Sequence, residues 1–393
     1  MQPRVPADGR YHSLDIWRGI GCLILVAYHS TFYCDSVFRL TQPSTWTVAG
    51  FPLMFLRMLW VGVPIFAVVS GYCIAASVDS LRRKPHSLSN YVVRRARRIY
   101  PPLWAACGLA IVFTFAVSLI PGAFEHTKQL PRIASMPYSS WFGNFTASEL
   151  WLSSLFSTEP NYLIKNTWTL GYEEQYYILA GLMLAISPKW FFGSTAVLSV
   201  SVLVVRHVGL GLGVPVKGFF FDGNWLTFAA GILVYHSLLH QNARGRVLSL
   251  CILFAIACYG LAGKFLHEVE FDQHISEYIF VAGLFGMLLI GIRRWDDSIA
   301  KARIMAPLVW FGRRSFSIYL THFPIVVTIS SLMSMYDWST ETTVVFIAVP
   351  LGLIISLPVA TWFHIAVERP FMNSAREKAR SPQPNMRMVE AKC

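Results

Sequence analysis

The sequence predicts an all-α membrane protein, a polytopic helical bundle with about ten transmembrane helices. Of its 393 residues, 54% are hydrophobic and only 14% are charged, whereas soluble domains carry about 25% charged residues. Apolar runs recur along the chain, each near or above the ~17–20 residues that a helix needs to cross the hydrocarbon core of a bilayer. Together these observations exclude an ordinary soluble domain and favour a chain embedded in a membrane.

The apolar runs follow one another along most of the chain. They span residues 15–34, 51–78, 99–121, 168–187, 190–206, 220–240, 247–265, 276–292, 315–335 and 343–366. We interpret residues 1–372 as one integral-membrane domain, because the runs indicate one helical bundle without separable parts. The sequence shows no internal repeat, which disfavours a transporter built from inverted halves. Residues 373–393 are rich in charge and contain Pro and Ser, and we expect them to form a disordered cytoplasmic tail.

The distribution of positive charge predicts the orientation. Lys and Arg gather in 82–98, 242–246, 293–303 and the segment after 368, which share one side of the membrane if the N-terminus is inside. The positive-inside rule therefore places both termini in the cytoplasm, with the protein in the inner cell membrane. The net charge of +12 then reflects topology and contact with anionic lipid, and we expect no nucleic-acid partner. The seven cysteines show no zinc spacing, so we expect no metal.

Two connections between the apolar runs are long. The connection over 121–166 carries Trp141, Phe142 and Phe145, and we expect it to fold over the outer mouth of the bundle. The connection over 293–314 contains an apolar stretch at 305–312, which we expect along the inner interface.

The first apolar run contains three ionisable residues, Asp15, Arg18 and His29. On a helix, the step of eleven residues from Arg18 to His29 ends only about 20° past three full turns, and Asp15 lies three residues before Arg18, so all three share one side. A charge near the bilayer centre costs at least about 2.5–3.5 kcal/mol. This stripe is therefore expected to face protein or water, which marks a pathway or a site.

Two clusters later in the chain allow a structural and a functional interpretation. Four arginines within residues 94–98 either anchor the topology at the inner interface or bind phosphates with their guanidinium groups. Glu173 and Glu174 either favour the start of the fourth helix or face a histidine and set its tautomer.

Two further segments carry residues of interest. The step from Ser70 to Gly71 permits a close approach of two helices or access to the backbone. Tyr319 and His322 lie three residues apart on one helix face, and His322 is either a packed interfacial histidine or part of a site.

Taken in order, five segments resemble the integral-membrane acyltransferase 3 family. They are Arg18 with His29 in "SLDIWRGIGCLILVAYHS", "FAVVSGY", Arg95 and Arg98 before "IYP", "WTLGYEEQYY" and "SIYLTHFP". The resemblance extends to "VERPF" (367–371) and implies an O-acyltransferase that takes an acyl group, acetyl above all, from cytoplasmic acyl-CoA. The acceptor it implies is a hydroxyl of a cell-surface glycan or glycolipid.

The resemblance also assigns roles to residues. It implies His29 as the general base, with Glu173 orienting the imidazole or stabilising its cation, and Arg18 as a third catalytic residue. Arg95 and Arg98, together with Arg18, are expected to bind the acyl-CoA donor. The expected substrate-binding residues are Ser70, Tyr72, Trp168, Tyr319 and His322. An acyl-histidine intermediate stays open as a variant of this mechanism.

The chain departs from the family pattern in two respects. Thr169 and Tyr172 replace the more usual Ser and Val, which is expected to reshape the pocket. The sequence ends soon after the last apolar run, without the soluble esterase-like domain of some family members, so we expect transfer within the membrane unit itself. The competing hypothesis is a transporter or flippase that uses Arg18 and His29 as a substrate or proton relay. The arginine pair before the third run disfavours it, because a transporter has no evident need for a phosphate clamp there.

Overall fold

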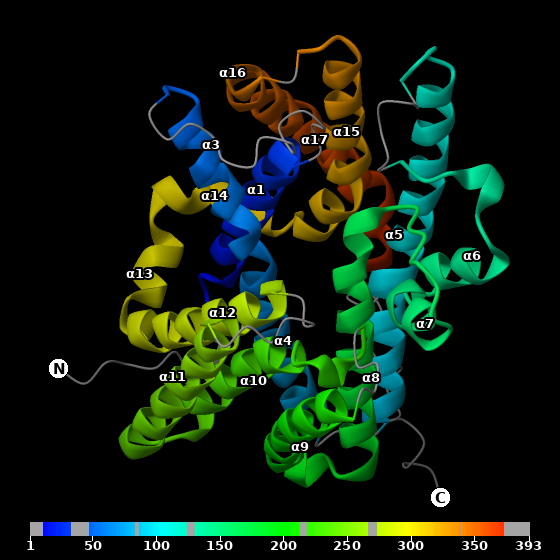
Figure 1. Cartoon of the computed structure of the whole chain (residues 1–393). Coiled ribbons are helices and arrows are strands. Elements are labelled where there is room, and N and C mark those ends of the chain that lie inside the picture. The colour runs from blue at the N-terminus through cyan, green and yellow to red at the C-terminus, as the bar shows by residue number, and fades with distance from the viewer. Residues whose placement is uncertain are drawn as a thin grey trace, which may run out of the picture.

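The computed structural model describes residues 11–32, 47–82, 86–123, 130–212, 218–265, 273–338 and 340–372. Over these residues the chain forms helices and no strands (Figure 1). The predicted all-α class is therefore confirmed. The predicted tail, 373–393, lies outside the described residues.

The helices range from single turns to rods of more than thirty residues. The long helices are α1 (Leu14–Phe32), α4 (Gly62–Leu81), α5 (Ser87–Ser118), α8 (Trp168–Ile186), α9 (Phe191–Gly211), α10 (Trp225–His240), α11 (Ala243–Phe265), α12 (Gln273–Ile292), α15 (Ser315–Met335) and α17 (Val349–Phe363). The short helices are α3 (Gly50–Arg57), α6 (Tyr138–Phe145), α7 (Glu149–Leu155), α13 (Asp296–Lys301), α14 (Ala306–Gly312) and α16 (Glu341–Thr343). Two π-helical segments, Val344–Ala348 and His364–Glu368, precede and follow α17.

Each of the ten predicted apolar runs coincides with a helix. Seven helical stretches are long and apolar enough to cross a membrane: Gly50–Leu81, Ser87–Ser118, Pro188–Gly209, Ala243–Phe265, His274–Lys301, Ser315–Met335 and Glu341–Met372. The other three are α10, which has only 16 residues, and α1 and α8, which are long enough but carry many polar side chains. The count of ten spans and the cytoplasmic termini stay predictions.

The arginine cluster lies within a helix, although we predicted a cytoplasmic loop over 82–98. The helix α5 begins at Ser87 and continues through residues 94–98 and the Pro101–Pro102 pair to Ser118. Proline is tolerated in membrane helices because neighbouring groups satisfy the freed backbone carbonyls. The arginines are therefore presented on a helix face at fixed angles, and part of the cluster turns toward the bundle interior.

The connection over 121–166 is also more ordered than its sequence suggested, because it contains α6 and α7 beside α5 and α8 (Figure 1). The indole nitrogen of Trp104 on α5 donates a hydrogen bond of 2.8 Å to the carbonyl oxygen of Phe145 at the end of α6. Of the described part of this connection, Lys165 and Asn166 line the central cavity described below, and Trp141, Phe142 and Phe145 do not. That the aromatic segment covers the outer mouth of the bundle stays a prediction.

Small residues let α4 and α10 pack with their backbones in contact. A side chain on Gly71 would collide with the carbonyl oxygen of Phe228, and one on Gly231 would collide with the carbonyl oxygen of Val68. The prediction of a close helix approach at Gly71 is confirmed, and only glycine fits at either position.

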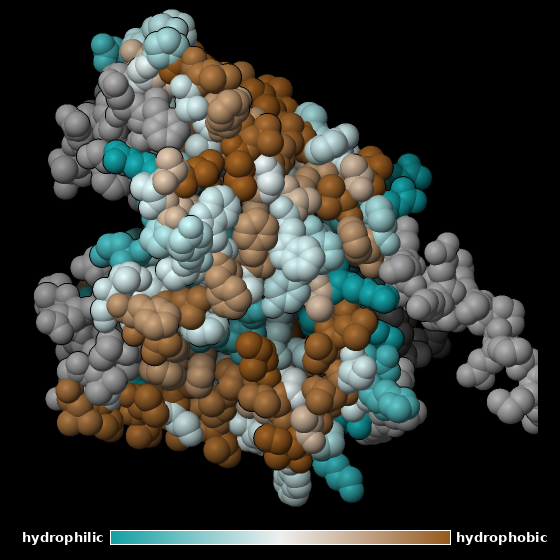
Figure 2. Space-filling view, turned by 90° about the vertical axis from the view of Figure 1, so that its right-hand side faces the viewer, coloured by the Kyte–Doolittle hydropathy of each residue, from teal (hydrophilic) through white to brown (hydrophobic). Residues whose placement is uncertain are grey.

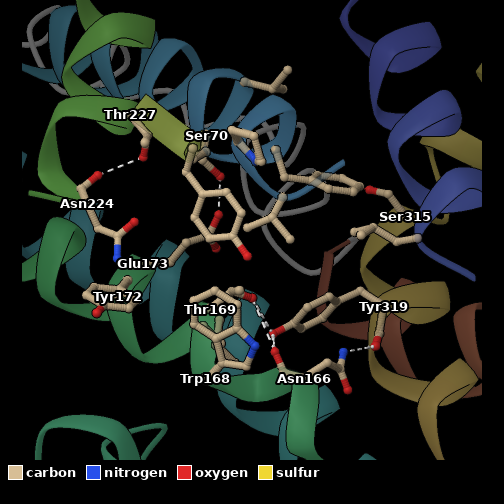
Figure 3. Close-up of a pocket in the computed structure, with 18 of the residues that line it drawn as sticks. Ser70, Asn166, Trp168, Thr169, Tyr172, Glu173, Asn224, Thr227, Ser315 and Tyr319 are labelled. Carbon is tan, nitrogen blue, oxygen red and sulfur yellow. Dashed lines mark hydrogen bonds between the residues drawn. The ribbon is translucent and has the colours of Figure 1, made fainter. Parts of the chain in front are cut away.

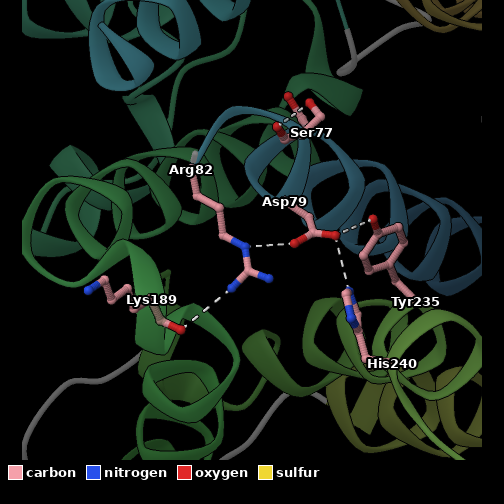
Figure 4. Close-up of polar contacts among 7 residues, drawn as sticks. Ser77, Asp79, Arg82, Lys189, Tyr235 and His240 are labelled. Atoms are coloured by element: carbon pink, nitrogen blue, oxygen red, sulfur yellow. Dashed lines mark hydrogen bonds and ion pairs between the residues drawn. The ribbon is translucent and has the colours of Figure 1, made fainter. Parts of the chain in front are cut away.

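The end of α4 is also held by polar contacts (Figure 4). The carboxylate of Asp79 lies 2.7 Å from Nε of Arg82, accepts a hydrogen bond of 3.0 Å from the Tyr235 hydroxyl, and lies 3.1 Å from Nε2 of His240. Arg82 in turn reaches the carbonyl oxygen of Lys189 at 3.5 Å. These contacts fix the ends of α4 and α10 against the start of α9. On the outer surface, hydrophobic side chains cover broad areas of the face in Figure 2, as expected for a lipid-facing surface.

Candidate active site

The central cavity has a volume of about 330 Å³ and lies among α1, α4, α5, α8 and α15. This volume falls within the range of about 300–1,000 Å³ that is typical of small-molecule sites. Seven of the ten predicted site residues line its wall: Arg18, His29, Ser70, Arg98, Trp168, Glu173 and Tyr319. Helices far apart in the sequence thus bring most of the predicted site together (Figure 3).

His29 on α1 and His322 on α15 form a pair. Nδ1 of His29 lies 2.8 Å from Nε2 of His322, and the two rings are nearly parallel, at 13°. His322 is almost completely buried, with 1% of its surface exposed, and its Nδ1 lies 2.7 Å from the carbonyl oxygen of Ile318. His322 therefore does not line the cavity itself but supports the histidine that does.

The backbone carbonyl of Ile318 determines which ring nitrogens of His29 and His322 carry a hydrogen. A carbonyl oxygen only accepts, so the neutral His322 ring carries its proton on Nδ1 and donates it to Ile318. Nε2 of His322 is then an acceptor, and Nδ1–H of His29 must donate to it. In this arrangement Nε2 of His29 carries no proton and is the basic atom of the pair.

Glu173 is bound to hydroxyl groups. The Ser70 hydroxyl donates to one carboxylate oxygen (Figure 3), and the Tyr177 hydroxyl donates to the other at 2.9 Å. The expectation that Glu173 orients His29 is therefore corrected, since the hydrogen-bond partner on Nδ1 of His29 is His322. Side chains on opposite sides of a cavity can share its wall without touching, which the sequence does not reveal.

Glu174 faces a different helix from Glu173. Its carboxylate accepts a hydrogen bond from the Tyr100 hydroxyl on α5, and it does not line the cavity. The two neighbours diverge because adjacent residues on a helix point about 100° apart. Glu174 thus joins α8 to α5 within the bundle.

Two arginines bring positive charge to the cavity. Arg18 donates to a carboxylate oxygen of Asp15 at 3.1 Å and lies 2.9 Å from Sγ of Cys73. Arg98 is close enough to Arg18 and Arg95 for their positive charges to repel one another. Among the described residues, Asp15 pairs with Arg18, and Glu173 lies in the same cavity wall. Three arginines against these two carboxylates leave a local excess of positive charge, which suits an anionic ligand.

Arg95 lies beside the cavity without lining it. Its guanidinium group packs over the ring of Tyr177 at 4.6 Å and over that of Tyr91 at 5.9 Å. Tyr72 is also outside the wall, because it lies two residues beyond Ser70 and points to the opposite side of α4. Its buried ring contacts the rings of Tyr11 and Tyr235. Arg95 and Tyr72 were therefore predicted as ligand contacts but pack as supports.

Tyr319 and Trp168 form an aromatic part of the wall (Figure 3). The Tyr319 hydroxyl donates to the carbonyl oxygen of Asn166 at 2.7 Å and lies 2.9 Å from the Thr169 hydroxyl. Thr169 and Tyr172, the two departures from the family pattern, both line the cavity.

Several wall residues were not identified from the sequence, among them Lys165, Asn224 and Thr227. Burial lowers the pKa of Lys165. Next to the wall, the completely buried Asp222 accepts hydrogen bonds from the Tyr172 hydroxyl and from the backbone N–H of Asn224 at 3.0 Å. The Asp-Gly step in "FDGNW" (221–225) is a turn signal that pointed to this loop.

Among the described residues, no three His, Cys, Asp or Glu side chains gather as metal ligands. The cysteines within the described residues form no disulfide: Cys22, Cys73, Cys107, Cys251 and Cys258 are free thiols.

Comparison with known proteins gives one family and several curated relatives. The family model described as an acyltransferase domain, acyltransferase 3, matches residues 11–364. Peptidoglycan O-acetyltransferase OatA of Listeria monocytogenes is 25% identical over 349 residues, covering 82% of this chain and 50% of that protein. O-acetyltransferase OatA of Staphylococcus aureus is 26% identical over 310 residues, covering 72% of this chain and 49% of that protein. The chain thus spans about half the length of these relatives. No solved structure gives a significant match.

Proposed function

Since this chain belongs to the acyltransferase 3 family, we propose that it moves an acyl group, acetyl above all, from cytoplasmic acyl-CoA to a hydroxyl of a glycan or glycolipid. The observation that carries the proposal is the His29–His322 pair, whose His29 ring lines a cavity that also presents Arg18 and Arg98. The names of the curated relatives make peptidoglycan the first acceptor to test.

His29 is the proposed general base. The acceptor oxygen attacks the thioester carbonyl carbon, the new ester bond forms, and the carbon–sulfur bond breaks. Nε2 of His29 takes the proton from the attacking hydroxyl and returns it to the leaving thiolate. A positioned base of this kind contributes roughly 10²–10⁴-fold to the rate.

His322 is proposed to position His29. Its Nε2 accepts the Nδ1–H of His29, which fixes the ring and leaves the basic nitrogen directed away from the pair. When His29 takes the proton, this hydrogen bond becomes charge-assisted and therefore stronger. His322 thus stabilises the transition state more than the ground state.

Ser70 and Glu173 are proposed to orient the acceptor. The Ser70 hydroxyl gives its hydrogen to Glu173, so its oxygen can accept a hydrogen bond from a second hydroxyl of the acceptor, beside the one that attacks. The Tyr177 hydroxyl holds the other oxygen of Glu173. This network holds the Ser70 oxygen in place as a hydrogen-bond acceptor in the cavity wall, and it leaves His29 available as the base.

Arg98 and Arg18 are proposed to bind the anionic part of the donor. Guanidinium groups bind phosphate in a bidentate fashion, and the one ion pair that Arg18 and Arg98 form among the described residues is that of Arg18 with Asp15. Arg18 and His29 lie about 16 Å apart along α1 at 1.5 Å per residue. A donor held at one end and an acceptor at the other can therefore meet inside the bundle.

Proteoliposomes with purified protein, acetyl-labelled acetyl-CoA and muramidase-solubilised peptidoglycan fragments test the proposal. We expect CoA release that depends on the fragments and label that appears in them as a base-labile ester. Movement of fragments across the vesicle with no CoA release would instead establish the transporter hypothesis, in which Arg18 and His29 form a relay.

A further inference from the structure

A second cavity, of about 650 Å³, lies away from the active site and shares no wall residue with it. It is formed by residues 300–303, by α14 and the two residues that follow it, and by the π-helical end of the last span. Its ionisable wall residues are Lys301, Arg303, Arg313, Arg314, His364 and Arg369. Within the described part of the chain, no carboxylate lines it.

The position of this basic cavity is set by the ends of three candidate membrane spans. One span ends at Lys301, the next begins at Ser315, and the last ends at Met372. Residues where spans begin and end lie at the level of the lipid headgroups. Trp310 in the cavity wall is 40% exposed, and tryptophan is enriched at this level of a membrane.

The positive charges of the basic cavity are only partly neutralised. Arg313 lies 3.7 Å from the Asp15 carboxylate, which already pairs with Arg18 at 3.1 Å. Behind the wall, the Glu368 carboxylate is occupied by the Ser317 hydroxyl at 2.5 Å and by His364 at 2.8 Å. Glu368 also attracts Arg314, and no salt bridge is recorded for Arg303 or Arg369 among the described residues. Six basic side chains therefore share two carboxylates that already have other partners, so the cavity carries a net positive charge.

The Nε–H group of Arg314 is a hydrogen-bond donor without an acceptor among the described residues. Its guanidinium group lies 3.9 Å from the ring of Trp310, and Nη1 donates to the carbonyl oxygen of the same residue at 3.0 Å. Nε of Arg314 is buried and makes no hydrogen bond within the described residues. An unpaired buried donor is costly, and a phosphate oxygen is a suitable acceptor for it.

An apolar stripe leads along the last span to the basic cavity. The exposed side chains of Leu351, Ile354, Ile355, Trp362 and Ile365 recur at helical spacing on α17 and the π-helical turn after it. Ile365 belongs to both the stripe and the cavity wall, and Arg369 follows one turn later. A ligand that combines a phosphate with an acyl chain matches this arrangement.

We propose that the basic cavity binds the phosphate of one anionic phospholipid, whose acyl chain lies along α17. Arg303, Arg314 and Arg369 contact the phosphate, and Arg314 supplies its Nε–H. A free nucleotide offers the same phosphate chemistry but has no group that would use the apolar stripe. This site is independent of the proposed acyl transfer.

Calorimetric titration of the full chain in an uncharged detergent with dioctanoyl phosphatidylglycerol tests the proposal. We expect saturable binding of one lipid per chain, and at least tenfold weaker binding of dioctanoyl phosphatidylcholine. In the triple variant Arg303→Gln/Arg314→Gln/Arg369→Gln, affinity should fall about 100-fold, because each arginine near an anionic surface contributes about one kcal/mol.

A matched control removes the same three charges elsewhere. Arg94, Arg244 and Arg246 are exposed and do not line the basic cavity, so Arg94→Gln/Arg244→Gln/Arg246→Gln should bind the lipid within twofold of the wild type. Equal losses in both triple variants would overturn the proposal in favour of unspecific attraction. Displacement of the lipid by CoA would overturn it in favour of a nucleotide site.

A second variant keeps the test decisive if the glutamine triple unfolds. Arg314→Lys retains the charge but lacks the Nε–H, and its melting temperature should match that of the wild type. We expect its lipid affinity to fall about tenfold, as for the loss of one charge-assisted hydrogen bond. Unchanged affinity in this variant would remove Arg314 from the site and refute the proposal as stated.

Discussion

Replacing His322 with leucine is expected to lower kcat about 2- to 30-fold with little change in KM. The hydrogen bond from His29 to His322, at 2.8 Å, contributes about 1 kcal/mol while both rings are neutral and about 1.5–3 kcal/mol once His29 is charged. The difference, about 0.5–2 kcal/mol, is present only in the transition state. A free-energy difference of about 1.36 kcal/mol changes a rate tenfold, so the loss of this difference lowers kcat by the stated factor.

Glutamine at position 322 provides the matched rescue. Its side-chain oxygen can take the place of Nε2 and accept the proton of His29, so His322→Gln should retain kcat within about threefold of the wild type. The assay is steady-state CoA release in detergent with varied acceptor. The melting temperature of each variant serves as a control, because His322 is 1% exposed and its loss could disturb packing.

The result for leucine decides the role of His322. A kcat within twofold of the wild type in well-folded His322→Leu would refute the positioning role. A rise in KM at unchanged kcat would instead show that His322 acts in substrate binding, as the sequence suggested.

Three further predictions concern the donor, the carboxylates and the helix contact. Arg98→Gln should raise KM for acyl-CoA at least tenfold, with a strong salt dependence, and Arg95→Gln should have a smaller effect because Arg95 packs on tyrosine rings; equal effects would contradict this division. Glu173→Gln should lower kcat about tenfold while Glu174→Gln stays within a few-fold, since only Glu173 lines the cavity; steady-state kinetics with the opposite order would reverse the assignment. Gly71→Leu should destabilise the bundle by at least about 1–3 kcal/mol, visible as a lower melting temperature in detergent, and an unchanged melting temperature would contradict the close helix contact.

The sequence predicted the helices well, because an apolar run long enough to cross a membrane must form a helix there. All ten predicted runs are helices, yet α1 and α8 fall outside the seven clearly apolar spans. Several of their polar residues, including His29 and Glu173, line the cavity. A helix that contributes the chemistry of a buried site necessarily looks less like a membrane span.

The partners of the site residues were not predictable from the sequence. His29 and His322 are 293 residues apart, and only the packing of α1 against α15 brings them together. Local spacing placed Glu173 opposite a histidine, but packing gave it Ser70 and Tyr177. Arg98 was expected to lie at the membrane surface, and the extension of α5 back to Ser87 turned it into the cavity.

The identity of the base is tested most directly by the rate of acyl transfer in His29→Ala. With purified protein in proteoliposomes, acetyl-CoA and peptidoglycan fragments, kcat should fall by about 10²–10⁴-fold, the contribution of a general base. Yield and melting temperature should match those of the wild type. A well-folded His29→Ala preparation that keeps a kcat within tenfold of the wild type would contradict the account, because the cavity would then perform transfer without its proposed base.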